Sequence, residues 1–290
     1  LALVAAIAEE EAQIKAVVTP EVWRKALLHP LQDPRLTEIF AIVWPIVAAR
    51  EGHTHAHHSV TREERAKVSL KSTDNLARYL GYAAGVFDVP APDYFPRPKE
   101  PGGLRIDALC EGEGDSRKVY PTIIAGRDTL REDSEVGLKF RAAAAISRVR
   151  SGHILASVLP TATSLRHVFF GAAHLAGIEI PPDSATEAER LTKHLKRFMS
   201  PSQVDQLGVH ARKVLDKGEP DLKGWVQGVA YTASRAGFVL CDSIDAAARV
   251  LTQQGDEGMA VPFKDRIRDL MAYSCSATYV KLRKDLGLSR

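Results

Sequence analysis

Apolar residues recur at helical spacing along most of the chain. One apolar helix face is formed by Leu76, Tyr79, Leu80, Ala83 and Phe87, and a longer one by Trp225, Val226, Val229, Ala233 and Leu240. Residues suited to cap helix N-termini precede other segments, among them Ser134 and the pair Ser200 and Gln203. The pattern predicts a mainly helical protein with about ten helices.

Two short stretches depart from the helical pattern and predict strands. They are Leu104–Leu109 and Tyr120–Ala125, and the polar, glycine-containing stretch Glu111–Arg117 between them predicts a turn. Before them, closely spaced prolines in residues 90–101 indicate a stiff, extended connector. We therefore expect an α+β fold, mainly helical, in which a small sheet lies beside the helix that carries Ala144.

The order of these segments predicts three regions. Residues 1–15 have a helical composition but no start signal, so we expect the terminal helix of a preceding helical unit in a longer protein. Residues 16–100 predict a helical subdomain followed by the proline-rich connector. Residues 101–290 predict a second domain that contains both strands.

Composition and charge exclude several classes of function. Hydrophobic residues make up 45% of the chain and the net charge is only +3, so we expect a folded core and no field that would attract nucleic acid. Three cysteines do not form a disulfide framework, which favours a reducing, cytoplasmic location. No apolar run approaches the roughly 20 residues of a membrane span. No glycine-rich phosphate loop and no nucleophile elbow is present.

A histidine cluster is the most conspicuous chemical feature of the sequence. It consists of His53, His55, His57 and His58. Imidazole groups at such spacing could bind zinc or copper. Within the run, however, only Glu51 could orient the rings, and the segment has the polar character of a loop between two helices. We interpret it as a surface loop, with adventitious metal binding as the alternative.

Two further segments resemble a known protein family in their order along the chain and in their residues. The first is the alanine-rich helix that ends in Arg150-Ser151-Gly152-His153, preceded by a strand. The second is the stretch Ala230–Gly237, which reads A-Y-T-A-S-R-A-G. Together they resemble the gluzincin metallopeptidases related to the CaaX-prenyl endopeptidases, over roughly residues 101–251. The arrangement also resembles the C-terminal region of large bacterial tetratricopeptide-repeat proteins.

The resemblance assigns each position of the family's zinc site to a residue of this chain. In the family, a His-Glu-x-x-His helix and a glutamate on a second helix hold the metal. Aligned on the Arg-Ser-Gly-His tail, the first histidine position is Ala144, the glutamate position is Ala145 and the second histidine position is Arg148. The third ligand position is Ala230. The alternative is a helix that never had a site, with small residues chosen for close packing.

The residues at these positions exclude zinc chemistry of that kind. Alanine has no lone pair for a metal and cannot act as a base, and Arg148 is a permanent cation. We therefore expect no metal or other cofactor and a non-catalytic module that binds another protein or a preceding helical-repeat region. Its expected binding groove contains Ile123 on an edge strand and Arg148. The alternative is an enzyme with a relocated metal site that uses His53, His55, His57 or His153.

Overall fold

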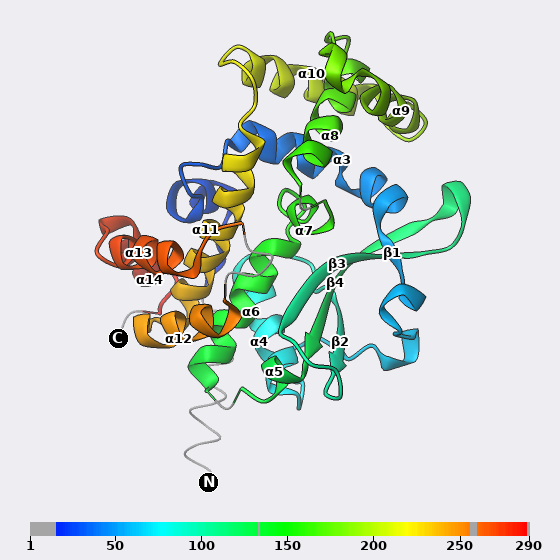
Figure 1. The fold of residues 1–290 in the computed structure, drawn as a ribbon. Coiled ribbons are helices and arrows are strands. Elements are labelled where there is room, and N and C mark those ends of the chain that lie inside the picture. The colour runs from blue at the N-terminus through cyan, green and yellow to red at the C-terminus, as the bar shows by residue number, and fades with distance from the viewer. Residues whose placement is uncertain (1–15, 133, 160, 256–259, 289–290) are drawn as a thin grey trace.

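The fold combines many helices with one small sheet, as expected (Figure 1). The computed structural model describes residues 16–132, 134–159, 161–255 and 260–288. The helix expected at residues 1–15 lies outside these ranges. The described residues form 13 α-helices, more than expected, because several are single turns such as α2 (Pro20–Val22), α5 (Arg127–Leu130) and α7 (Leu155–Val158).

The sheet has four strands in the order β1-β3-β4-β2. Strands β3 (Leu104–Glu111) and β4 (Lys118–Gly126) form the expected antiparallel hairpin, closed by the 3₁₀ turn η4 (Gly114–Ser116). Strand β1 (His53–Thr54) pairs in parallel with β3, and β2 (Asp93–Arg97) pairs in parallel with β4. Neither outer strand was expected from the sequence.

The expectation that Tyr120–Ala125 forms a sheet edge is wrong. This stretch belongs to β4, which is covered on one side by β3 and on the other by β2. Ile123 pairs with both neighbouring strands and is fully buried, so it is a core residue and cannot line a groove. The reason is that part of the proline-rich connector becomes β2, where Pro96 is tolerated because β2 is the outermost strand.

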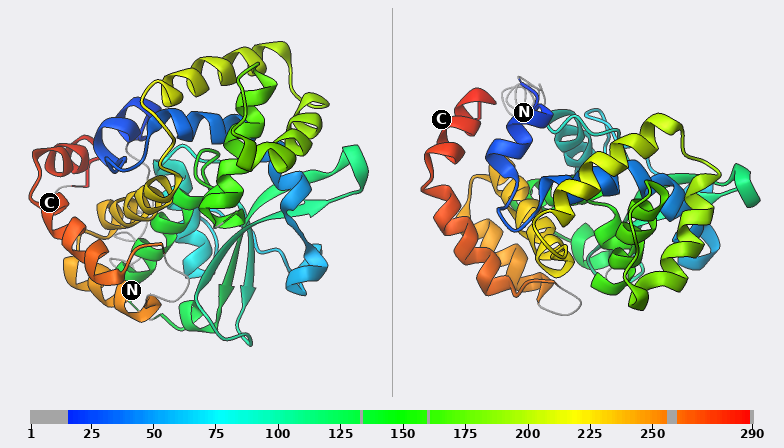
Figure 2. Two further views of the ribbon diagram at one scale, coloured as in Figure 1. Left: turned by 45° about the horizontal axis from the view of Figure 1, so that its top comes forward. Right: turned by 90° about the horizontal axis from the view of Figure 1, so that it is seen from above.

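Helix α6 (Glu135–Val149) packs on the sheet and, with several other helices, forms the larger core. The others are α4 (Asn75–Val86) and α11 (Leu222–Cys241), followed by α12 (Ile244–Gln254), α13 (Phe263–Ser274) and α14 (Ala277–Asp285). Helices α6 and α11 lie side by side (Figures 1 and 2). A Cβ atom at Gly237 would lie 2.8 Å from the backbone oxygen of Phe140, so glycine permits this close approach.

A second core lies among the remaining helices, at the top of Figure 1. Trp225 of α11 is fully buried there against Phe40. The helices are α3 (Pro34–Glu51), α8 (Ala162–Leu175), α9 (Ala185–Lys196) and α10 (Pro201–Leu215). Short turns complete the chain: η1 (Trp23–Leu27), η2 (His55–His58), η3 (Arg62–Glu64) and η5 (Pro182–Ser184).

Residues on both sides of the domain boundary expected at residue 100 contribute to the same sheet and to the same core. Strands β1 and β2 precede it and β3 and β4 follow it, yet all four belong to one sheet. Helix α4 likewise packs on α6 in the larger core. Among the described residues, no helix is both long enough and apolar enough to cross a membrane.

Candidate functional site

A cavity of about 790 Å³ lies between α6, α11 and the start of β3. Such a volume is within the range of small-molecule sites. The structure brings all four family-derived positions to its wall, namely Ala144, Ala145, Arg148 and Ala230. Helices α6 and α11 therefore face each other at the cavity. Further lining residues include Leu104, Ile106, Asp128, Gln253, Gln254 and Arg266.

Three of the four family-derived positions, Ala144, Ala145 and Ala230, are alanines at the cavity wall. Ala144 and Arg148 are four residues apart and therefore share one face of α6. Ala230 lies opposite on α11, where its carbonyl oxygen accepts a hydrogen bond from the Ser234 hydroxyl at 3.0 Å. The Nε of Arg266 donates to the same hydroxyl at 2.9 Å. The wall between the helices thus combines alanine side chains with Val226, Val229 and a hydrogen-bonded arginine.

Three arginines and one aspartate, Asp128, line the cavity. Arg141 is 5% exposed and lies 3.4 Å from a carboxylate oxygen of Glu132, and it donates to Gln253 at 2.5 Å. Within the described part of the chain, its buried Nε has no hydrogen-bond partner. Arg266, 6% exposed, is the second arginine of the wall.

Arg148 is the third arginine and has no acidic partner within the described ranges. Its Nη2 donates to the Ser157 hydroxyl at 3.1 Å, and burial lowers the pKa of its guanidinium. Glu135, an acid that could have paired with it, instead lies 3.8 Å from Lys139 and accepts a hydrogen bond from Tyr79. A guanidinium at a cavity wall without a carboxylate favours an anionic ligand.

The free sheet edge next to this cavity belongs to β3. Strand β1 covers β3 only at Leu109 and Cys110, so in the described chain no strand lies beside its first half. Gly126 donates its backbone N–H to the Gly103 oxygen, so these two residues form a hydrogen-bonded pair of the hairpin. Hydrogen-bonded and non-hydrogen-bonded pairs alternate along antiparallel strands. The backbone groups of Leu104 and Ile106 therefore point toward the open edge, while both residues line the cavity.

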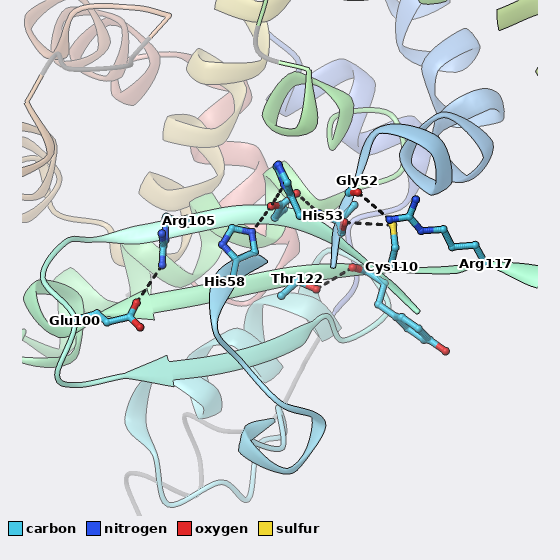
Figure 3. Close-up of polar contacts among 11 residues, drawn as sticks. Gly52, His53, His58, Glu100, Arg105, Cys110, Arg117 and Thr122 are labelled. Atoms are coloured by element: carbon cyan, nitrogen blue, oxygen red, sulfur yellow. Dashed lines mark hydrogen bonds and ion pairs between the residues drawn. The ribbon is translucent and has the colours of Figure 1, made fainter. Parts of the chain in front are cut away.

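The histidine segment is built into the sheet and is not a loose loop. His53 begins β1 and pairs with Leu109 of β3. Arg117 donates to the Gly52 backbone oxygen at 3.1 Å (Figure 3). A Cβ at Gly52 would lie 2.6 Å from the Ala108 oxygen, so glycine lets the chain run close to β3 immediately before the histidines.

Three of the histidines converge beside a buried carboxylate that the sequence analysis missed. Asp107 of β3 is 6% exposed, and its Oδ2 lies 2.7 Å from His53 Nδ1 and 2.6 Å from His58 Nε2. The two histidines are labelled in Figure 3. One ring nitrogen of each of His53, His57 and His58 lies within 4.8 Å of the others. The available signal was an aspartate inside a predicted apolar strand, since a buried acid requires partners.

The other two histidines of the metal hypothesis lie apart from this group. His55 turns toward Phe95 and lies 3.5 Å from Glu111, and burial lowers its pKa. His153 is 1% exposed, with Nδ1 2.8 Å from the Ser147 oxygen and Nε2 2.7 Å from Gln32. Burial, assisted by Arg150, lowers the pKa of His153 to about 3. Both of its nitrogens are occupied, so it is a core hydrogen-bonding group.

Comparison with protein-family models, with curated proteins and with solved structures finds no match for this chain. The cavity and the histidine group must therefore be interpreted from their chemistry.

Proposed function

We propose that this protein is a non-catalytic binding domain that holds an extended, acidic segment of a partner protein in the cavity between α6 and α11. One observation carries the proposal, namely that Arg148 faces this cavity without a carboxylate partner in the described ranges. A carboxylate of a bound segment would form the charge-assisted hydrogen bonds that Arg148 lacks.

The free edge of β3 supports an extended conformation of that segment. An added strand would use the backbone groups of Leu104 and Ile106, while its side chains would enter the cavity. The alanine wall leaves room for them.

The residues at the wall also support the absence of peptide hydrolysis by zinc. Such catalysis needs metal ligands with lone pairs and a base beside the bound water. Ala144, Ala145 and Ala230 supply neither. We propose descent from a gluzincin metallopeptidase related to the CaaX-prenyl endopeptidases, with the groove kept and the metal lost.

The proposed partner is another protein or a helical-repeat region that precedes this domain. The sequence resemblance favours the second setting, in a cytoplasmic bacterial tetratricopeptide-repeat protein. Either partner would present a segment of chain to the same cavity.

The test is selection of ligands from a displayed library of random peptides, followed by calorimetry on the peptides obtained. We expect the selected peptides to be enriched in Asp and Glu. Arg148→Glu should weaken their binding at least about tenfold, because losing one partner of a buried charge pair typically costs about 2–5 kcal/mol.

Arg190→Glu is the matched control, because it makes the same charge change on the exposed surface of α9. It should leave the affinity unchanged. Thermal unfolding of both variants shows whether the fold is kept, and Arg148→Met provides a second variant of similar volume. If folded Arg148→Glu binds the selected peptides as tightly as the parent protein does, the cavity is not their binding site.

A further inference from the structure

The histidine group on the outer face of the sheet is a second candidate for ligand binding, independent of the cavity. Asp107 lies next to Ile106 on β3, and successive side chains of a strand point to opposite faces. Ile106 lines the cavity, whereas Asp107 contacts His53 and His58. The two sites are therefore separated by the thickness of the sheet.

We propose that His53, His57 and His58 bind a divalent transition-metal ion of the zinc class beside Asp107. Neutral imidazole is a preferred ligand of such ions. The three rings already offer ligand atoms within 4.8 Å of one another. Two nitrogens bound to one tetrahedral zinc ion lie about 3.4 Å apart, so the rings must move closer together when the ion binds.

His57 supplies this movement. It is exposed, and its ring stacks on that of His53 with centroids 3.9 Å apart. Two stacked rings cannot both direct a nitrogen in their planes at one ion, so the exposed His57 ring turns when metal binds. His58, whose side chain is only 10% exposed, remains fixed against Asp107.

Asp107 acts as the positioning residue. One of its oxygens accepts hydrogen bonds from a ring nitrogen of both His53 and His58. Each ring then carries its proton toward the carboxylate and keeps a lone pair on its other nitrogen. Carboxylates play this part beside metal-bound histidines, where they fix the tautomer and increase the basicity of the ring.

The resulting metal site would cross-link the two ends of the β1–η2 segment. His53 is held by its pairing with Leu109 of β3, and the ion would tie His57 and His58 to it. Because metal binding to the folded state alone stabilises it, saturating zinc should raise the melting temperature.

Titration of the full chain with zinc chloride, followed by calorimetry and by the ¹H–¹⁵N signals of the histidine rings, tests the proposal. We expect one ion per chain, released by EDTA, with ring signals shifted only for His53, His57 and His58. His57→Gln should lower the affinity at least about tenfold, and Asp107→Asn by about 10–100-fold.

His174→Gln is the matched control, because His174 is exposed on α8, away from the group. It should bind zinc as the parent protein does. His57 is also exposed, so its replacement should not disturb the fold. The proposal is overturned if the parent protein takes up no zinc. It is equally overturned if His57→Gln binds zinc with unchanged affinity, or if His174→Gln weakens binding as much.

Discussion

Replacing Ala144 and Arg148 by histidine and Ala230 by glutamate is expected to create a zinc site between α6 and α11. The three positions line one cavity, and the two histidines would lie four residues apart on one helix face. Two histidines and a glutamate form a known three-residue zinc set that leaves one coordination position open. The triple variant should bind one zinc ion more per chain than the parent protein.

The increase over the parent protein is the measured quantity, because zinc at the histidine group on the sheet would contribute equally to both. The additional zinc is measured as metal content after gel filtration and by calorimetric titration. The matched control carries the same two histidines with Ala230→Gln, whose amide is a poor zinc ligand, and should bind the added ion about tenfold or more weakly. A folded triple variant that binds no additional zinc would contradict the proposed descent from a metallopeptidase.

The helices could be predicted from sequence because their signals are local. The capping box at Ser200 and the N-cap at Ser134 are present, and α11 ends at Cys241 as the apolar pattern indicates. These features depend on residues within one or two turns. Strands β1 and β2 could not be predicted, because β1 has two residues and β2 contains Pro96. Both are stabilised by pairing with the central hairpin and carry little signal of their own.

The same difference between local signals and long-range pairing applies to the cavity and to the histidine group. Ala144, Ala145, Arg148 and Ala230 could be placed together because two sequence landmarks marked two facing helices. The partner of the histidines could not be placed, since Asp107 follows His58 by 49 residues and meets it only through the pairing of β1 with β3. The true sheet edge was missed for a related reason, since it depends on which strands flank the hairpin.

Acid is expected to destabilise the protein through His153. This ring is held neutral in the fold, where burial lowers its pKa to about 3, whereas in the unfolded chain it takes up a proton near its ordinary pKa of 6.5. Below pH 6.5 the unfolded state therefore binds more protons than the folded state. The free energy of unfolding should fall by up to about 1.4 kcal/mol per pH unit from this group until the pH approaches 3.

His153→Gln isolates this contribution. Glutamine offers one donor and one acceptor, so it can serve both the Ser147 oxygen and Gln32, but it does not titrate. We expect the variant to be less stable than the parent protein at pH 7.5, because the ring packing against Trp23 is lost. The difference should shrink as the pH falls, because the parent protein alone loses the His153 contribution.

Urea unfolding at pH 7.5, 6.0 and 4.5 measures the two slopes, and carboxylates that titrate in both proteins cancel in the comparison. His174→Gln should keep the slope of the parent protein, since that ring is exposed. Parallel stability curves for the parent protein and His153→Gln would show that His153 accepts a proton in the folded state. In that case the buried hydrogen bonds to Ser147 and Gln32 could not be the arrangement that holds this ring neutral.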